Sequence, residues 1–422
     1  MVANSPLPSS PTKNTNEPAR CPVDHAQYKT ARNAVANASP IEKDADGTWH
    51  IRDYDLAKII LRGDGTQQAG FKAELLGSLP TAARRPILYQ EGPEHLEQRK
   101  QTAKFFTPKA VSAYKPIMAQ VAQQMVEQLE RDKRADLRQL SLGMAMRVVA
   151  EVVGLTNSSK PGIEKRLDTF LGDAGDYGRW HPKRILYLVK TRISVLRFFQ
   201  LDVKPAIEAR KREPKDDLIS YLISQNYKDW EIFTECVTYG AAGMVTTREF
   251  IGLALWHLMS QPPVRARYLV AGEEERHAIL HEVLRLEPIV TQLKRRMTED
   301  VTVTHNGQPI TLRTGEWVQI DVQAVNADES VVGAGPLALC PVRELHKPVV
   351  MPSVLGFGDG HHRCPGAYVA LQETDVLLQR LLKLNGLRIE REPDVRWSTT
   401  ASGYELHNFI IAIEPPTPKG ES

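Results

Sequence analysis

The chain has 422 residues, of which 42% are hydrophobic and 25% are charged, and it carries a net charge of +3. This is the composition of a globular protein with a large core, and it excludes a mostly disordered chain, a collagen and a repeat array. The small net charge gives no indication of nucleic-acid binding. The four cysteines lack the spacing of a disulfide framework and favour a reducing compartment.

The two ends of the chain are predicted to be flexible tails. Residues 1–22 are rich in Pro, Ser and Asn and lack the apolar core of a signal peptide, and residues 416–422 are similar. The most apolar stretch, residues 250–259, is too short to span a membrane. No low-complexity linker divides residues 23–415. We therefore expect one domain, in a soluble, cytoplasmic protein without a membrane anchor.

Helical patterns fill the middle of the chain, after a short strand pattern at residues 48–53. Residues 118–132 and 137–155 repeat apolar side chains with the period of a helix. Residues 214–225 carry a proline and two acids at their start, which favours a helix N-terminus there. Residues 229–260 are predicted to form one helix of about 30 residues, roughly 45 Å long at 1.5 Å per residue.

Strand patterns return towards the C-terminus. Residues 300–312 are predicted to form a hairpin with Asn306-Gly307 at its turn. Residues 316–326 and 408–415 also have strand patterns. The predicted fold class is therefore mainly α, with a minor β-sheet annex.

The most distinctive segment is the glycine-rich loop at residues 357–366, FGDGHHRCPG, which precedes an amphipathic helix. Cys364 lies just before the helix N-terminus, where backbone N–H groups stabilise a thiolate. Glycines let the backbone approach a flat partner closely, and Arg363 and His362 suit an anionic group. The loop therefore predicts a site for a flat, anionic partner at this cysteine.

Other interpretations of the loop are weaker. A lone cysteine is commonly a small buried hydrophobe. A nucleotide loop needs a third glycine where His361 stands, or a Gly-Lys-Ser/Thr segment, and both are absent. A zinc site of His361, His362 and Cys364 lacks a fourth ligand nearby, and the CxxCH motif of covalently attached haem is absent.

The loop has every fixed residue of F-G-x-G-x-H-x-C-x-G, and so resembles the haem-ligand signature of the cytochrome P450 superfamily, soluble bacterial type. The resemblance implies a haem b whose iron is bound by the Cys364 thiolate, between the long central helix above and the cysteine loop beneath. It places Phe357 near the sulfur and His362 at a haem propionate. Gly366 is the last fixed residue of this haem-binding loop.

Two further segments resemble propionate-binding segments of the family. His95 and Arg99 match H-x-x-x-R. The R-x-x-x-x-D segment selects Arg295, with Arg296 as the competitor. Together with His362, these cations would neutralise the two haem propionates, which are costly to bury unpaired.

A structural ion-pair cluster is also implied by the resemblance. Glu282 and Arg285 match E-x-x-R, and Arg343 matches the third partner. In the family these residues are structural, not catalytic. Leu339 and Cys340 stand where the family has Phe and Asp, so the local packing departs from the family pattern.

Residues 240–247 of the long helix resemble the family's A-G-x-D/E-T-T/S segment. The resemblance implies that small residues, Gly243 among them, let haem and O2 lie against the helix. Thr246, followed by Thr247, would help to deliver protons during O2 activation, through a hydroxyl that bonds back into the helix. Without the other motifs, close helix packing explains the same residues.

The usual acid of this segment is replaced by Val245, which cannot relay a proton. Glu249 lies four residues on, on the same stripe of the helix, but a surface carboxylate beside Arg248 is the favoured interpretation. A water chain from Thr246 and a group on the substrate are the other routes.

By position, the resemblance places the substrate contacts in residues 64–91, 170–195, 289–294 and 402–407. The candidates for lining an apolar pocket are Met244, Val245, Leu293 and Tyr404. Three aromatic residues fall in the expected lid region, where core packing is an equal interpretation: Tyr177, Trp180 and Tyr187.

The resemblance implies a monooxygenase that inserts one oxygen atom from O2 into an apolar small molecule. Electrons from NAD(P)H would arrive through a separate small acidic protein, a ferredoxin or flavodoxin, and its reductase. A basic face suits that partner: Lys100, Lys104, Lys109 and Arg363. One alternative, motivated by Val245, is the same haem with peroxide-driven oxidation, coupling or dehydration. Another is a non-enzymatic haem sensor or binding protein.

Overall fold

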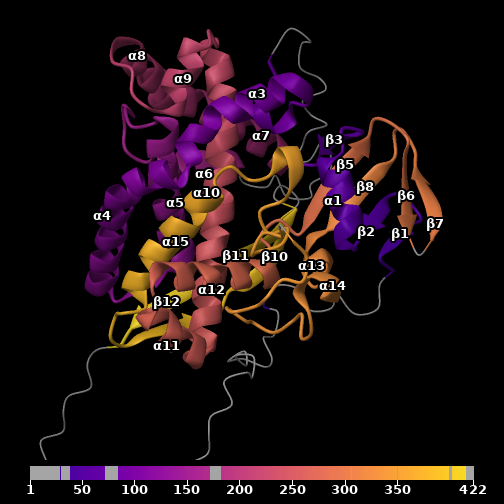
Figure 1. Ribbon diagram of the computed structural model, residues 1–422. Coiled ribbons are helices and arrows are strands. Elements are labelled where there is room, and N and C mark those ends of the chain that lie inside the picture. The colour runs from indigo at the N-terminus through magenta and orange to yellow at the C-terminus, as the bar shows by residue number, and fades with distance from the viewer. Residues whose placement is uncertain are drawn as a thin grey trace, which may run out of the picture.

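Helices form most of the protein, and its largest sheet lies to one side of them (Figure 1). This computed structural model confirms the predicted fold class. It describes residues 29, 39–71, 84–171, 182–305, 307–348, 350–398 and 402–414. For residues 168–171, 182–185, 187, 188 and 191 it describes the backbone alone. The expected tails, residues 1–22 and 416–422, lie outside the described residues.

The described α-helices are α1 (Tyr54–Arg62), α3 (Gly92–Thr102), α4 (Pro108–Asp132), α5 (Leu137–Val153), α6 (Ile163–Leu171), α7 (Pro182–Phe198), α8 (Lys204–Arg212), α9 (Leu218–Ser224), α10 (Asp229–Ser260), α11 (Pro262–Val270), α12 (Glu273–Leu286), α13 (Val322–Val325), α14 (Glu329–Val332) and α15 (Ala367–Leu381). Short 3-10 helices are η1 (Ile87–Tyr89), η2 (Ala103–Phe106) and η4 (Gly360–His362), and η3 (Phe199–Val203) is a π-helical turn.

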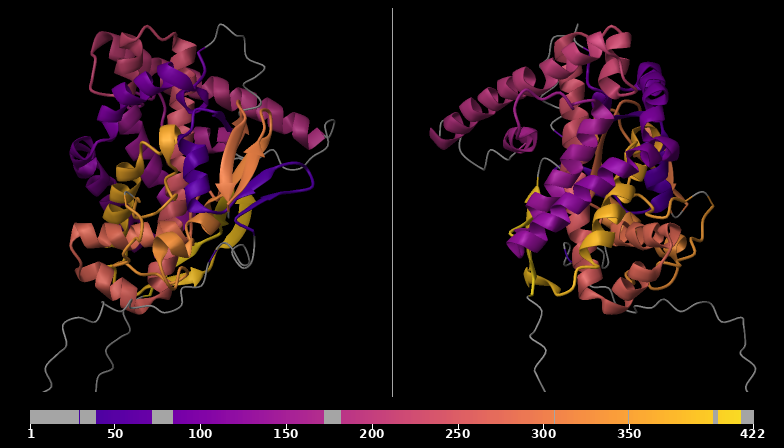
Figure 2. Two further views of the ribbon diagram at one scale, coloured as in Figure 1. Left: turned by 45° about the vertical axis from the view of Figure 1, so that its right-hand side comes forward. Right: turned by 90° about the vertical axis from the view of Figure 1, so that its left-hand side faces the viewer.

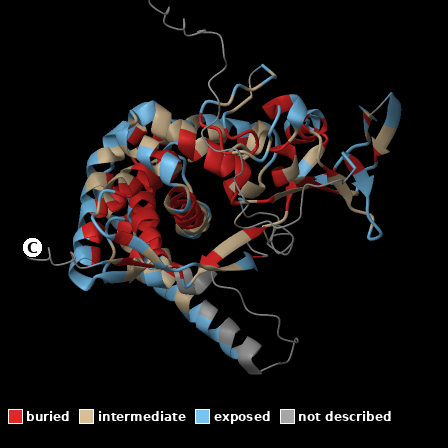
Figure 3. Ribbon diagram, turned by 90° about the horizontal axis from the view of Figure 1, so that it is seen from below, coloured by how far each residue is buried: buried red, intermediate tan, exposed pale blue. Residues whose placement is uncertain are grey.

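The predicted central helix is confirmed as α10. It has 32 residues, which corresponds to about 48 Å at 1.5 Å per residue. Every residue from Phe250 to Leu258 is buried, as expected for a helix that is apolar on all sides. Figure 3 looks along α10 and shows elements packed on several sides of it. Its main neighbour is α5.

The helix predicted at residues 118–132 lies within α4, and the one predicted at 137–155 is α5, which ends at Val153, two residues earlier. The helix predicted at residues 214–225 begins later than expected. α9 starts at Leu218, and the Asp217 side chain caps it by accepting a hydrogen bond from the Ser220 backbone N–H at 2.9 Å. Asp217 also pairs with Arg210, and both side chains are buried. The acid that suggested an early helix start is therefore the cap itself.

Five strands form the largest sheet, in the order β1-β2-β8-β5-β3. β2 lies parallel to β8, and the other neighbours in this sheet are antiparallel. The described strands are β1 (Ile41–Lys43), β2 (Trp49–Ile51), β3 (Thr66–Ala69), β4 (Arg134–Asp136), β5 (Gln292–Met297), β6 (Val301–His305), β7 (Gln308–Leu312), β8 (Trp317–Asp321), β9 (Leu387–Arg391), β10 (Asp394–Ser398), β11 (Gly403–His407) and β12 (Ile410–Ile413).

The predicted hairpin is confirmed as β6 and β7, in which Val301 lies opposite Leu312. The strands predicted near the start and the end of the chain are β2 and β12. The strand predicted at residues 316–326 is shorter, because β8 ends at Asp321 and the chain continues directly into α13.

Buried apolar side chains form three clusters. The first surrounds the second half of α10, with contributions from α4, α12 and α15. The second joins the first half of α10 to α5, α8 and α9. The third fills the space between α1 and the largest sheet. The core therefore surrounds α10 along both halves of its length.

α7 projects from the body of the protein (Figure 2). Four apolar side chains on one face of it are 49–57% exposed: Leu186, Val189, Ile193 and Leu196. This face takes no part in the described core.

The structure bears on two expectations, the lack of a membrane anchor and the reducing compartment. None of the described helices combines the length and the apolar character needed to cross a membrane. Cys236 and Cys364 are free thiols, whereas Cys340 is disulfide-bonded. One disulfide is not the framework that the cysteine spacing excludes, but it does not support a reducing compartment.

Candidate haem site

The cysteine loop, residues 357–366, is closed by a backbone bond and pressed against α1. The Cys364 N–H donates to the Phe357 carbonyl oxygen at 2.8 Å. Gly360 has a φ of 66°, in the left-handed region that favours glycine. A Cβ there would lie 2.0 Å from the Leu61 carbonyl oxygen, so only glycine fits against the end of α1.

An ion pair fastens the same loop to α1. Arg62, the last residue of α1, donates from Nε and Nη2 to the two carboxylate oxygens of Asp359, at 2.8 and 3.1 Å. Asp359 also accepts a hydrogen bond from the Gly360 backbone N–H at 2.8 Å. Two-point pairing fixes the relative orientation of a guanidinium and a carboxylate. α1 therefore helps to set the position of the loop that carries Cys364.

Cys364 is exposed, but neighbouring protein atoms still withdraw its thiol partly from solvent. Burial raises the pKa of the Cys364 thiol, and the Gly366 backbone N–H and the charges of Arg99 and Arg363 oppose the rise. The expected hydrogen bond at the helix N-terminus is present, but burial outweighs it. A bound metal cation would stabilise the thiolate more strongly than these groups do.

Phe357 and Gly366 lie at the two ends of the loop. A Cβ at Gly366 would be 3.9 Å from Cys364 Sγ, so the glycine leaves the sulfur uncovered on that side. The Phe357 ring packs edge-on against the His281 ring of α12, with centroids 6.2 Å apart and planes at 88°.

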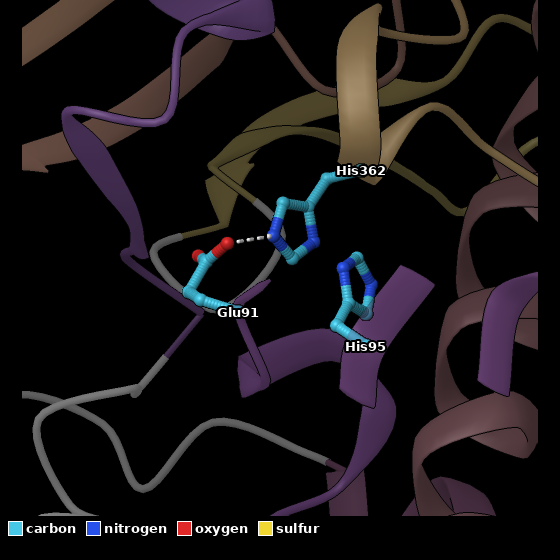
Figure 4. Close-up of side chains that lie close together, drawn as sticks. All are labelled: Glu91, His95 and His362. Atoms are coloured by element: carbon cyan, nitrogen blue, oxygen red, sulfur yellow. Dashed lines mark hydrogen bonds and ion pairs between the residues drawn. The ribbon is translucent and has the colours of Figure 1, made fainter. Parts of the chain in front are cut away.

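The side chains predicted to bind the haem propionates lie close to one another. We call His95, Arg99, Arg295 and His362 the propionate cluster. The His95 and His362 rings are stacked, with centroids 4.5 Å apart and planes at 19° (Figure 4). Arg99 donates to the carbonyl oxygen of Arg363 in the cysteine loop. α3 and the loop, more than 260 residues apart in sequence, therefore meet in this cluster.

Arg295 is buried, with 3% of it exposed, whereas its competitor Arg296 is exposed. The described hydrogen bonds of Arg295 go to Gln68 Oε1 at 2.5 Å and to the Lys294 carbonyl oxygen at 3.0 Å, not to a carboxylate. Burial lowers the pKa of Arg295 to about 10, which leaves it charged at neutral pH. A buried guanidinium without a bonded carboxylate is costly, so this position suits an anionic group.

His95 has an unsatisfied polar atom in the same place. The residue is 1% exposed, and its Nδ1 is buried without a hydrogen-bond partner among the described residues. Burial, assisted by the charges of His362 and Arg99, lowers the pKa of His95 to about 4. Its imidazole is therefore neutral near pH 7 and offers one N–H donor and one acceptor.

Glu91 and Gln68 complete the cluster, and the sequence analysis missed both. Glu91 Oε2 lies 3.0 Å from His362 Nε2, and Glu91 Oε1 accepts a hydrogen bond from the Gln68 backbone N–H at 2.5 Å. Burial opposes ionisation of Glu91, but His362, the Gln68 backbone N–H and the charge of Arg295 together outweigh it and lower the pKa of Glu91. The sequence signal was an acid four residues before His95 at a helix start, which is a common position for an acid.

Glu91, His95 and His362 also offer ligand atoms within 4.8 Å of one another, as a metal site would. Stacked rings direct their lone pairs into nearly parallel planes, so the two imidazoles are poorly placed to bind one ion. The charge of Arg295 also acts on Glu91 and would repel a cation. The cluster therefore suits the carboxylates of a haem better than a metal ion.

On α10, Thr246 bonds back into the helix as predicted. Its hydroxyl donates to the Ala242 carbonyl oxygen at 2.7 Å. A Cβ at Gly243 would lie 2.5 Å from Val149 Cγ2 on α5. This contact explains the glycine by close helix packing, the alternative raised above.

Known proteins are similar to this chain in sequence over most of its length. A family model described as Cytochrome P450 matches residues 277–398, which include the E-x-x-R segment and the cysteine loop. The biotin biosynthesis cytochrome P450 of Bacillus subtilis is 24% identical over 80% of this chain and 84% of its own. The mycinamicin IV hydroxylase/epoxidase of Micromonospora griseorubida is 26% identical over 83% of this chain and 85% of its own. The chain belongs to the cytochrome P450 superfamily.

Solved structures of P450s share the fold. CalO2 gives a TM-score of 0.74 at 21% identity, over 90% of this chain and 94% of its own. P450BioI, solved in complex with an acyl carrier protein ligated to hexadec-9Z-enoic acid, gives 0.71 at 21% identity, over 89% and 95%. Relatives also include the erythromycin C-12 hydroxylase of Saccharopolyspora erythraea, 26% identical over 84% of this chain. This P450 is accordingly an oxidoreductase of the monooxygenase class.

Glu249 does not replace the missing acid of this P450. It pairs with Arg248 at 2.6 Å, as favoured above, and accepts a hydrogen bond from the Leu406 backbone N–H at 2.7 Å. The prediction of a surface carboxylate is wrong, because Glu249 is only 2% exposed. Both carboxylate oxygens are engaged in joining α10 to β11, so this acid is not available as a proton relay.

A different acid lies closer to the threonine pair, and the sequence analysis missed it. Glu373 of α15 is 1% exposed and hydrogen-bonded to the Thr247 side chain. Burial raises the pKa of Glu373 well above its ordinary value, because the ionised carboxylate is poorly solvated there. The available signal was an acid on the apolar face of an amphipathic helix. Such a residue is more often exposed at the margin of that face.

The predicted substrate-lining residues divide into two kinds. Met244 is fully buried among the apolar side chains shared with α5, so it belongs to the core rather than to an open pocket. The other three are half-buried: Val245, Leu293 and Tyr404. The Tyr404 ring lies edge-on to Trp397 in the β10–β11 hairpin, with centroids 5.2 Å apart. The expected lid side chains Tyr177, Trp180 and Tyr187 lie outside the described residues.

The structural ion-pair cluster of the family is assembled in this P450. Arg285 donates to both oxygens of Glu282, at 2.6 and 3.0 Å, and Arg343 Nε lies 3.3 Å from Glu282 Oε2. The Cys340 backbone N–H donates to the same carboxylate at 2.9 Å. Cys340 therefore satisfies the cluster through its backbone, and Leu339 is buried beside it.

Of the four residues predicted to form a basic face for electron delivery, the three lysines lie at the surface. Lys100, Lys104 and Lys109 are all exposed. Lys104 lies 3.3 Å from Asp216, but both side chains remain mostly in solvent, where such a pair is weak. Arg363 is half-buried, and its Nε has no described hydrogen-bond partner.

Proposed function

We propose that this P450 inserts one oxygen atom from O2 into an apolar small organic substrate. The observation that carries the proposal is the free, exposed Cys364 beside the propionate cluster, in which Arg295 and His95 are buried and His95 Nδ1 has no described partner. These residues fit a haem b, whose iron Cys364 would bind and whose two carboxylates the propionate cluster would bind. The bound haem supplies the O2 activation chemistry.

The chain's own residues supply the protons in this proposal. The Thr246 hydroxyl can exchange its bond to the Ala242 carbonyl for one to a water or a substrate group. Glu373 is buried, which raises its pKa well above the ordinary value, and it contacts Thr247, the next residue on α10. We therefore propose Glu373 as the acid that resupplies this region, in place of the family acid that Val245 replaces.

The electron supply is proposed to be external. A ferredoxin or flavodoxin with its reductase would carry electrons from NAD(P)H to the face that carries Lys100, Lys104 and Lys109. Replacing these three lysines by glutamate should weaken association most at low ionic strength, because screening reduces the effect at high salt. Dependence on NAD(P)H also favours a cytoplasmic location.

The test is a titration of the ferric, haem-loaded protein with a panel of apolar compounds, followed by turnover in 18O2 with ferredoxin and reductase. A saturable shift of the haem band for one class of compound, and one 18O atom in the product, are expected. Ligand binding without turnover under any electron supply would instead favour a haem sensor.

A second candidate function is favoured by the apolar side chain at Val245. The same site would then use peroxide rather than O2, or catalyse coupling or dehydration. Turnover with hydrogen peroxide that exceeds turnover with O2, ferredoxin and reductase would favour this candidate. The reverse result favours the monooxygenase reaction.

A further inference from the structure

Glu91 connects two distant segments of the chain to the propionate cluster (Figure 4). Its Oε1 accepts a hydrogen bond from the Gln68 backbone N–H of β3, and its Oε2 lies 3.0 Å from His362 Nε2 in the cysteine loop. The side-chain oxygen of Gln68 in turn accepts a hydrogen bond from Arg295 of β5 at 2.5 Å. One carboxylate thus contacts His362 directly and Arg295 through a single residue.

The position of the His362 ring also matters for His95. The two rings are stacked, and His95 is 1% exposed with an unpartnered Nδ1. A His362 ring that turned away would remove the surface on which the His95 ring rests. Glu91 therefore influences the positions of three members of the propionate cluster: His362, His95 and Arg295.

We propose that Glu91 is a positioning residue of the haem site, which holds His362, and through Gln68 also Arg295, where these side chains bind the haem propionates. Because Glu91 occupies Nε2 of His362, Nδ1 is the ring nitrogen left for a second partner. This inference rests on the proposed haem site, and nothing in the family motifs assigns the role to Glu91.

The role follows from the hydrogen bonds of Glu91 and not from its charge. A negative charge in this place repels the propionates, which are also anions, so charge alone would weaken haem binding. The two hydrogen bonds, by contrast, fix β3 and the cysteine loop relative to each other. A neutral side chain of the same length should therefore preserve the function, and a shorter side chain with the same charge should not.

Three variants separate these two explanations. Glu91→Gln keeps the length, an acceptor oxygen for the Gln68 N–H and an NH2 group that can donate to Nε2 of a neutral His362 ring, but it removes the charge. Glu91→Asp keeps the charge but shortens the side chain by one CH2 group, and Glu91→Ala removes both properties. Glu94→Ala is the matched control, because Glu94 is an exposed acid in the same first turn of α3.

The measurement is the rate at which the haem-loaded protein loses haem to an excess of apomyoglobin. We expect about tenfold or faster loss for Glu91→Ala and Glu91→Asp, because neither side chain can keep both the hydrogen bond to the Gln68 N–H and the one to His362. Loss from Glu91→Gln should stay within about threefold of the parent protein, and Glu94→Ala should not differ from it. Resonance Raman bands of the propionates should shift in Glu91→Ala but not in Glu94→Ala.

Two results would overturn the role of Glu91. One is an unchanged rate in both Glu91→Ala and Glu91→Asp, and the other is faster loss from Glu91→Gln than from Glu91→Asp. If Glu91→Ala does not fold, the comparison of the Gln and Asp variants still decides between position and charge. A parent protein that binds no haem through a thiolate would refute the proposed function itself, which is a separate outcome.

Discussion

The contact between Gly243 and Val149 predicts a cost for a single methyl group in the centre of the protein. In Gly243→Ala, the new Cβ would lie 2.5 Å from Val149 Cγ2, well inside the separation of about 3.5–4.0 Å that carbon atoms prefer. Val149 is 7% exposed and β-branched, so it has few other positions. Overpacking costs about 1–3 kcal/mol, and Gly→Ala in a helix gains about 1 kcal/mol. We expect the free energy of unfolding to fall by about 1 kcal/mol.

A double-mutant cycle isolates the cause. Val149→Ala removes the atom that the new methyl would meet, so Gly243→Ala made in that background should be neutral or slightly stabilising. The coupling between the two sites should be about 1–2 kcal/mol, measured by urea unfolding of the haem-loaded protein. Equal effects of Gly243→Ala with and without Val149 would refute the argument from the α5 contact. An altered haem spectrum in both backgrounds would instead assign the glycine to the haem side of α10.

Further predictions concern the ligand, the buried ion pairs and pH. Cys364→Ala should keep the circular dichroism of the parent but lose the thiolate haem spectrum, and a retained spectrum would contradict the ligand assignment. Glu282→Ala should lower the free energy of unfolding by about 3–5 kcal/mol, because a buried arginine loses its partner. In the exposed control Glu273→Ala the change should be at most about 1 kcal/mol. Burial raises the pKa of Glu235 to about 7 and lowers that of His281 to about 4. Stability from Glu235 is thus lost as pH rises from 4.5 to about 7, and stability from His281 is lost as pH falls from 6.5 to about 4. Between pH 4.5 and 6.5, the free energy of unfolding should therefore rise more steeply with pH in Glu235→Gln than in the parent, and less steeply in His281→Gln. Slopes equal to that of the parent would count against both assignments.

Motifs with fixed spacing predicted the part of the site that the chain builds locally. The cysteine loop and the back-bonded Thr246 are each defined by residues within a few positions of one another, so sequence spacing carries the geometry. His95 and His362 are distant in sequence, and their stacking could be anticipated only because both matched segments of one family pattern.

The residues that the sequence analysis missed depend on tertiary pairing. Gln68 faces Arg295 because β3 pairs with β5, and no local pattern encodes that register. Glu373 lies on the apolar face of α15, and its contact with Thr247 forms only because α15 packs against α10. The same reason explains the error at Glu249, whose burial comes from its bond to the β11 backbone.

The fit of Gly360 against the end of α1 has a consequence for protein engineering. The Arg62–Asp359 pair joins positions 297 residues apart, and the Gly360 backbone leaves no room for a change in the path of α1. In hybrids made by recombining this chain with a relative, the N-terminal segment through Arg62 and the cysteine loop would therefore have to come from the same parent. A crossover anywhere between α1 and the loop would take the two sides of this contact from different parents, whereas a crossover before α1 keeps both sides from one parent.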